Sequence, residues 1–313
     1  MRSTMVDEVA NAVMYEGYLL YPYRATALKN RHRFNFGVLA PRDACGGDGG
    51  GWSGDDSWFA QTECLVRANL EVKVTVRVRF LHLLDSKAPG ASQGWQEAVE
   101  REVSCPVKFG DAVRNVSRHQ FAFMASVESR QQALNGQIDV SAEAVADGVA
   151  KLLVVVSNLT ASRELPPVSL LSRSFVSTHA ILDVETGGEF VSMTDPPAEL
   201  ALAAAECRNI RLWPVLAGDA SQRNTVLASP IILYDYPQIA PESAGDFFDG
   251  TEIDEMLALR VLTMTDEEKD QARRTDPRAR LLVDRTEALS DEQLLKLHGV
   301  LRGMRPVNDG ASR

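Results

Sequence analysis

The chain has 313 residues, of which 45% are hydrophobic and 24% charged, fractions that are typical of globular proteins. A chain of this length forms one large domain or two medium ones and buries a large core. A formal net charge of −10 repels phosphate backbones, so we expect no nucleic-acid partner.

No stretch of the sequence predicts a membrane span. The longest uninterrupted aliphatic run, LLVVV at 152–156, is far shorter than the roughly 20 residues that a helix needs to cross a bilayer. Near the amino terminus, Asp7 and Glu8 stand where a signal peptide would need an apolar stretch. We therefore expect a cytoplasmic protein.

Alternating apolar and charged residues give the clearest sign of secondary structure. Residues 70–80, LEVKVTVRVRF, predict a strand with one apolar face and one charged face in contact with water, as in an antiparallel sheet. Residues 121–127 repeat the alternation, and Asn135-Gly136 predicts a turn between strands. KLLVVVSNL at 151–159 reads as a more central strand. Further strand candidates are 175–184, 210–216 and 229–236.

Helices are predicted at 197–207 and after Pro237. In that last part, Thr251, Thr265, Asp276 followed by Pro277, and Ser290 each provide the start of a short helix. We therefore predict a mainly β, or α+β, fold. Residues 1–240 would form an antiparallel β-sandwich-like body with a glycine-rich surface loop at 45–56. Residues 241–313 would form an acidic α-helical C-terminal extension.

The run from 229 to 257 joins these two parts. We expect Ile231 and Leu233 to be buried on a strand of the main sheet, which Pro237 and Pro241 end because proline lacks the N–H of a ladder. The tail helices would pack back on the body through Ile253, Leu257 and Val261. A docking surface would remain at the accessible acidic rim, formed by Asp246, Asp249 and Glu252.

Motifs of catalysis and cofactor binding are missing. The cysteines, at 45, 64, 105 and 207, form no tight pair of the kind that zinc sites use, and we expect free thiols packed as small hydrophobic groups. The histidines form no short metal-binding pair, and no lysine with serine or threonine follows the glycines of 45–56. We therefore expect no cofactor and no stoichiometric metal, which favours a protein that is not an enzyme.

Two groups of residues remain candidates for a functional site. Arg24, Lys29 and Arg31 form a basic cluster that would hold an anion or an acidic partner, or else pair with the protein's own acidic tail. Cys64 beside Glu63 is a possible thiol or metal site if His179 or Cys207 joins it in space. The carboxylates near Asp246 lack the order of a calcium-binding EF-hand and suit turn and helix capping better.

Three long phrases resemble one family. They are LLYPYRATALKNRHRFNFGVLAP at 19–41, QTECLV at 61–66, and the stretch from 229 to 280. They are similar to an uncharacterised family encoded in the accessory gene clusters of nickel–iron (NiFe) hydrogenases. The resemblance implies a role in hydrogenase biogenesis or support, with a hydrogenase subunit or maturation factor as partner, and it implies no mechanism. The main hypothesis is a non-catalytic accessory, assembly or scaffold protein. The alternative is a metal-handling or thiol-dependent enzyme that uses Cys64.

Overall fold

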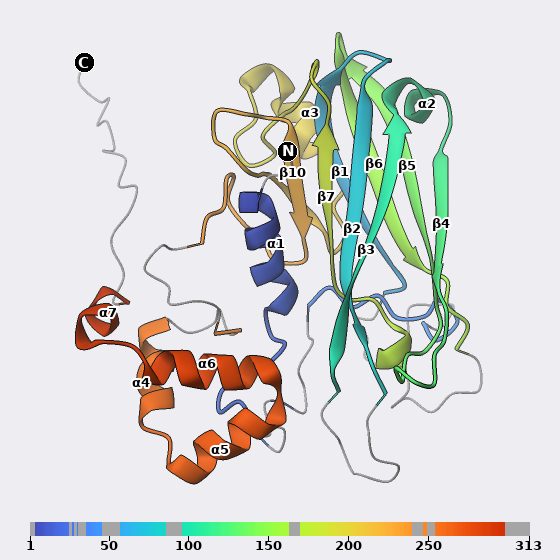
Figure 1. The fold of residues 1–313 in the computed structure, drawn as a ribbon. Coiled ribbons are helices and arrows are strands. Elements are labelled where there is room, and N and C mark those ends of the chain that lie inside the picture. Colours follow the sequence, from blue (N-terminus) through green and yellow to red (C-terminus); the bar gives the residue numbers. More distant parts are fainter. Residues whose placement is uncertain are drawn as a thin grey trace, which may run out of the picture.

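Two five-stranded antiparallel sheets pack face to face in the computed structural model (Figure 1). The structure describes residues 4–24, 27, 30, 36–45, 57–85, 96–162, 170–239, 247–248 and 254–297. The β4–β8 sheet has the strand order β4-β5-β6-β1-β8, and the β3–β9 sheet has the order β3-β2-β7-β10-β9. The strands are β1 Phe59–Ala68, β2 Lys73–Leu83, β3 Ala98–Lys108, β4 Ser117–Phe123, β5 Leu134–Ala146, β6 Val149–Asn158, β7 Val176–Val184, β8 Gly188–Phe190, β9 Trp213–Leu216 and β10 Thr225–Ser229. The expected β-sandwich body is confirmed.

The main core lies between the sheets and follows the predicted alternation. Val74, Val76, Val78 and Phe80 of β2 are buried there against apolar residues of β5 and β6. The strand predicted at 70–80 nevertheless starts too early, because Leu70 lies before β2 and is 50% exposed.

Two local predictions in this region are wrong. The strand at 121–127 is displaced, since β4 ends at Phe123 and Val127 is 97% exposed. Asn135 and Gly136 form no turn but lie inside β5, paired with Ala122 and Phe121 of β4. Gly136 is needed for packing, because a Cβ atom there would overlap the Phe121 ring. Tertiary packing therefore overrides the turn preference of the dipeptide.

The predicted strand at 229–236 is also wrong for most of its length. β10 ends at Ser229, directly before Pro230, whose missing N–H cannot continue the ladder. Ile231 and Leu233 are half-buried and belong to no strand. Leu233 packs on the outer side of the β3–β9 sheet, against the apolar cluster that includes Ile181 and Leu227.

The helices are shorter than the sequence suggested in the middle of the chain. The expected helix at 197–207 consists of a 3-10 turn at Ala198–Leu200 followed by α3, Ala201–Ala205. α1 (Thr4–Tyr15) and α2 (Phe109–Arg114) were not predicted. Among the described residues, no helix is both long enough and apolar enough to pass through a membrane.

The described C-terminal helices begin at the predicted caps in three of four cases. They are α4 Asp254–Leu262, α5 Asp266–Thr275, α6 Pro277–Glu287 and α7 Asp291–Lys296. Thr265 and Ser290 form complete capping boxes, and Asp276 caps α6 with Pro277 at its first position. Thr251, Ile253 and Pro241 lie outside the described residues.

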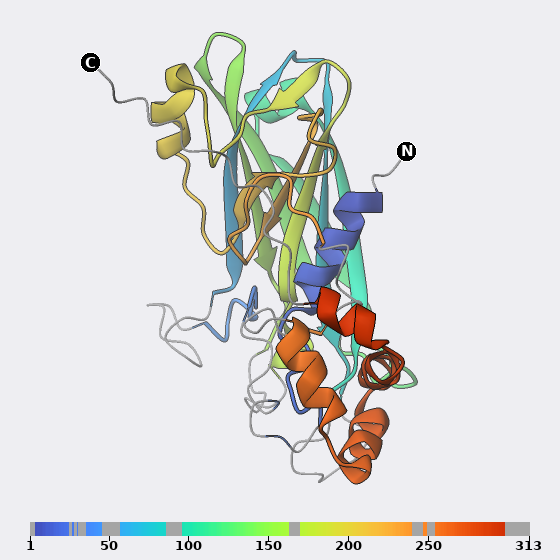
Figure 2. The same cartoon turned by 90° about the vertical axis from the view of Figure 1, so that its left-hand side faces the viewer.

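The tail packs back on the body, as expected. Leu257 and Val261 are buried in a second cluster with Leu81 and Leu83 of β2 and with Tyr18. Figure 2 shows α1 running along the sandwich toward the C-terminal helices, so both ends of the described chain lie on one side of the body.

Candidate functional site

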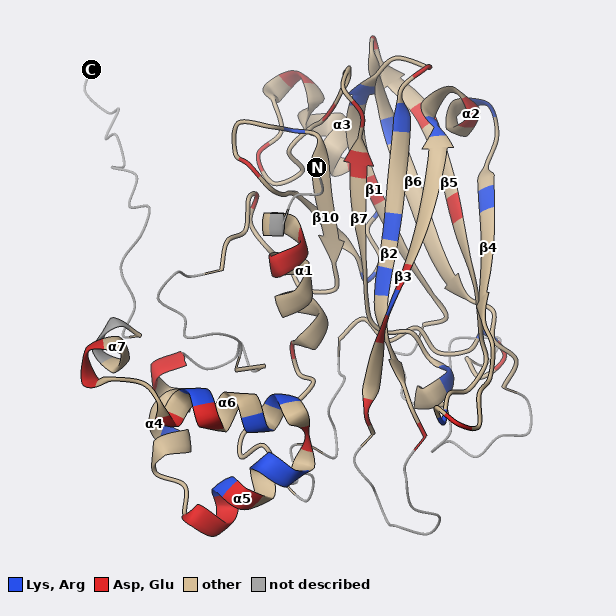
Figure 3. Ribbon diagram, viewed as in Figure 1, with Lys and Arg blue, Asp and Glu red and all other residues tan. Residues whose placement is uncertain are grey.

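Two arginines on the charged face of β2 are buried, contrary to the expectation of a face in contact with water, whereas Lys73 on the same face is exposed. Arg77 is 5% exposed and Arg79 is 8% exposed. α1 covers them: the Arg77 Nη1 atom lies 2.9 Å from Asp7 Oδ1, and Arg79 Nη2 donates to Asn11 Oδ1 at 2.7 Å. Figure 3 shows the basic residues along β2 and the acidic residues on α1. The alternation was predicted correctly, but the helix that covers it was not.

Carboxylates from two further strands complete this ionic layer. Glu102 of β3 lies 3.6 Å from Arg77 and 3.7 Å from Arg79, and Asp183 of β7 lies 3.4 Å from Arg77 Nε. Burial lowers the pKa of Arg77, but the hydrogen bond to Asp7 and the charge of Asp183 outweigh it and raise the pKa overall. Arg77 therefore stays charged and neutralised by the protein's own groups.

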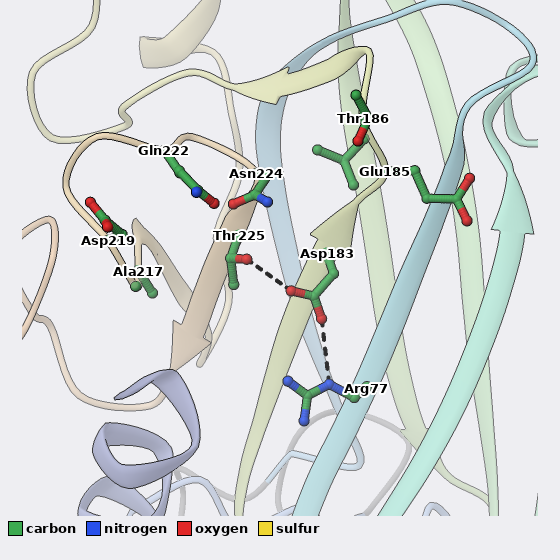
Figure 4. Close-up of a pocket in the computed structure, with 11 residues that line it drawn as sticks. Arg77, Asp183, Glu185, Thr186, Ala217, Asp219, Gln222, Asn224 and Thr225 are labelled. Carbon is green, nitrogen blue, oxygen red and sulfur yellow. Dashed lines mark hydrogen bonds and ion pairs between the residues drawn. The ribbon is translucent and has the colours of Figure 1, made fainter. Parts of the chain in front are cut away.

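A polar hollow of about 790 Å³ opens beside Arg77 (Figure 4). Asp183 forms its floor, bonded to Arg77 on one side and to the Thr225 hydroxyl on the other, at 2.8 Å. Glu185 and Asp219 stand on opposite walls in Figure 4. Backbone and side-chain hydrogen bonds from Ser221 hold the pKa of Asp219 below its ordinary value, so this wall is anionic.

The hollow is lined mainly by polar and charged residues. The groups at its floor are satisfied by one another, and no Cys, His or Lys is among the residues that line it. The carboxylates nevertheless face solvent, with the Asp183 side chain 40% and the Glu185 side chain 60% exposed. Lys73 lies 3.8 Å from Glu185 and offsets part of this charge. The arrangement suits a basic or hydrogen-bonding group of a ligand.

The segment after β10 is fixed to the wall of this hollow. Asp235 accepts hydrogen bonds from the Leu216 N–H at 2.8 Å, from Ser192 Oγ at 2.5 Å and from Thr194 Oγ1 at 2.9 Å. The Tyr236 hydroxyl donates to the carbonyl of Gln222, a lining residue, at 3.0 Å. These bonds hold the backbone of 231–236 in place.

Two large apolar side chains of that segment point outward. Tyr234 is 88% and Ile232 is 74% exposed, whereas Leu233 between them packs inward. We call the exposed side chains of Ile232 and Tyr234 the Ile232–Tyr234 surface. The sequence reasoning missed it because it assigned these residues to a strand, although their odd–even alternation already separated inward from outward positions.

Only part of the predicted basic and acidic sites lies within the described residues. Arg24 forms an ion pair with Glu268 of α5 at 3.3 Å, so its pairing with the acidic tail is confirmed. The other members of these sites, Lys29, Arg31, Asp246, Asp249 and Glu252, lie outside the described residues.

The structure brings Glu63, Cys64 and Cys207 together but keeps His179 apart. Burial, with smaller effects of Cys207 and Glu63, raises the pKa of the Cys64 thiol far above its ordinary value, the opposite of what a thiolate nucleophile needs. Glu63 accepts the Arg208 N–H at 2.7 Å and thus anchors a neighbouring loop. His179 belongs to the other sheet, opposite Arg79.

The four cysteines are packed as free thiols. Cys45, Cys64 and Cys105 are buried and Cys207 is half-buried, all as free thiols, which confirms the expectation. Within the described ranges, no group of three or more His, Cys, Asp or Glu side chains is arranged to hold a metal ion. Neither the family models nor the curated proteins contain a match to this chain.

Proposed function

We propose that this chain is a non-catalytic assembly or scaffold protein that binds a partner protein through the Ile232–Tyr234 surface. The resemblance of its sequence phrases suggests the context, in which the partner is a subunit or a maturation factor of a nickel–iron hydrogenase. The observation that carries the proposal is the pair of exposed apolar side chains on a backbone that Asp235 fixes through three hydrogen bonds.

Fixed apolar side chains favour association for two physical reasons. Covering them with a partner removes apolar area from water, and tyrosine is among the residues that contribute most to binding at interfaces. The backbone of 231–236 is already ordered, so binding loses less conformational entropy than it would with a mobile loop.

The hollow to which Tyr236 is bonded adds negative charge that defines the chemistry of the partner. Glu185 and Asp219 lie on the walls of the hollow to which the segment is attached. A partner with an apolar side chain flanked by lysine or arginine would match both features. Because the carboxylates are exposed, their attraction acts mainly on the association rate and weakens as salt screens it.

Affinity purification from the native host, followed by identification of bound proteins, tests the proposal. We expect the unaltered chain to retain a hydrogenase subunit or maturation factor, and the variant Ile232→Ser with Tyr234→Ser to lose it. Val127→Ser is the matched control, because Val127 is 97% exposed at the distant turn after β4. Retention of the same partner by the double variant, or its equal loss in the control, would refute the proposed surface.

A further inference from the structure

Two arginines near one end of the sandwich have no carboxylate partner among the described residues. Arg101 of β3 donates to the side chain of Gln131 and stacks over the Phe123 ring at 4.8 Å. Arg173, which ends the 3-10 turn Leu171–Arg173, donates to the Ala161 carbonyl and to the Gln132 side chain, both at 3.0 Å. All of these acceptors are neutral, so neither guanidinium group pairs with a carboxylate within the described part of the chain.

Other arginines of the same sandwich pair with carboxylates. Arg77 lies 2.9 Å from Asp7, Arg79 lies 3.4 Å from Glu100, and Arg130 lies 2.8 Å from Glu97. The chain has 43 acidic and 33 basic residues, so carboxylates are in excess. Arg101 and Arg173 are half-buried and have no carboxylate partner among the described residues. They therefore depart from the rule that partly buried charges are paired.

Each of these two groups also has an unused donor. The Nε atoms of Arg101 and Arg173 are buried and have no hydrogen-bond acceptor. A buried N–H without an acceptor destabilises the fold, and this cost disappears when an acceptor binds. Arginine presents its donors as a planar fork that matches the two oxygens of a carboxylate or phosphate.

Two observations place the two arginines in one region. Their acceptors Gln131 and Gln132 are consecutive residues. The ring of His82, which is fully buried, lies near both Arg101 and the backbone of Ser172, the residue before Arg173. Burial, and then the charge of Arg101, lowers the pKa of His82 to about 4, so that its ring is neutral at pH 7. The charged groups of the region include the two arginines and Asp85, whose carboxylate accepts a hydrogen bond from Gln132.

We propose that Arg101 and Arg173 form a binding site for an oxyanion, either a free one such as phosphate or a dicarboxylate, or the carboxylate of an acidic side chain. The oxyanion would accept hydrogen bonds from both guanidinium groups, which now contact only neutral acceptors. This site comes from β3 and the turn before β7, and it is independent of the Ile232–Tyr234 surface.

Titration of the purified full chain with phosphate, succinate and a short blocked peptide containing one glutamate tests this proposal, with chloride at matched ionic strength as reference. We expect a saturable rise of the unfolding midpoint with at least one oxyanion and none with chloride. In the same titration, NMR should show the pKa of His82 rising, because a bound anion favours imidazolium.

Substitutions locate the effect. Arg101→Gln and Arg173→Gln should each weaken oxyanion binding at least tenfold, whereas Arg118→Gln should leave it unchanged, because Arg118 is exposed and paired with Asp139. If Arg101→Gln does not fold, Arg101→Lys keeps the charge without the fork and should still weaken binding. A response to the peptide alone identifies a protein side chain as the ligand, and a response to the free anions identifies a small molecule. A chloride response equal to the others, or undiminished binding in the Arg173→Gln variant, would overturn the proposal.

Discussion

Arg77 is the residue at which α1, β3 and β7 meet. Asp7, Asp183 and Glu102 surround it, and Arg77→Ala would leave these like charges without their shared cation. Breaking a buried pair costs about 3–5 kcal/mol, but the three carboxylate side chains are 31–40% exposed and water screens them. We therefore expect a loss of about 2 kcal/mol in the free energy of unfolding, measured with urea. The control Arg274→Ala removes a pair at 4.0 Å whose arginine is 80% exposed, and should cost less than about 0.5 kcal/mol. Equal losses would contradict this account.

Two buried histidines predict how stability depends on pH. Burial lowers the pKa of both His82 and His179 to about 4, below the ordinary value of about 6.5. Between these pH values the unfolded chain binds more protons than the folded one, so stability is full above pH 6.5 and is lost as the pH falls. Each histidine should contribute up to about 1.4 kcal/mol per pH unit to that loss. Urea unfolding at pH 6.5, 5.5 and 4.5 measures the slope. An unchanged slope in both His82→Gln and His179→Gln would show that the rings do not titrate in this way.

At the scale of elements, the sequence predicted what depends on neighbours in the chain and missed what depends on distant partners. The helix starts at Thr265, Asp276 and Ser290 were correct because a cap bonds to residues two or three positions away. The end of β10 was wrong because a ladder ends where its partner strands and a proline dictate. The hollow was not predictable for the same reason: Arg77, Asp183 and Thr225 come from three strands, and one sequence does not state their pairing.

The cap of α6 also has a tertiary role. Asp276 is 3% exposed, accepts the Arg278 N–H at 2.7 Å and accepts a hydrogen bond from the Tyr18 hydroxyl at 3.0 Å. Ser290 caps α7 at an exposed position. Because Asp276→Ala removes a helix cap and a buried link to the N-terminal segment, we expect it to cost about 2–3 kcal/mol, against about 1 kcal/mol for Ser290→Ala. Chemical denaturation followed by hydrogen exchange in α6 measures both. A smaller cost for Asp276→Ala than for Ser290→Ala would rule out the tertiary role.

At the scale of the whole molecule, the N-terminal segment joins the C-terminal helices to the sandwich. Arg278 of α6 stacks over the Tyr15 ring at 4.1 Å, and the Tyr15 hydroxyl donates to Glu100 of β3 at 2.6 Å. Gly17 N–H donates to the Phe248 carbonyl at 2.9 Å. The sequence indicated that the tail would pack back through Leu257 and Val261. It did not indicate that the end of α1 and the residues after it form part of the surface that receives the tail, because these segments lie at opposite ends of the chain.

This arrangement predicts what removal of residues 1–16 would do. The deletion removes Met14 and Tyr15 from the cluster that holds Leu257 and Val261, and it exposes the arginines of β2 to water. The core between the two sheets has no residue from α1 and should persist. We therefore expect hydrogen exchange to accelerate at least tenfold in α4 and α6, equivalent to about 1.4 kcal/mol, while β5 and β6 keep their protection. Glu8→Ala, an exposed change on the same helix, should leave both regions as they are. Undiminished protection of α6 in the shortened chain would mean that the tail is held by the sandwich alone, and uniform loss across β5 and β6 would mean that α1 is part of one cooperative core.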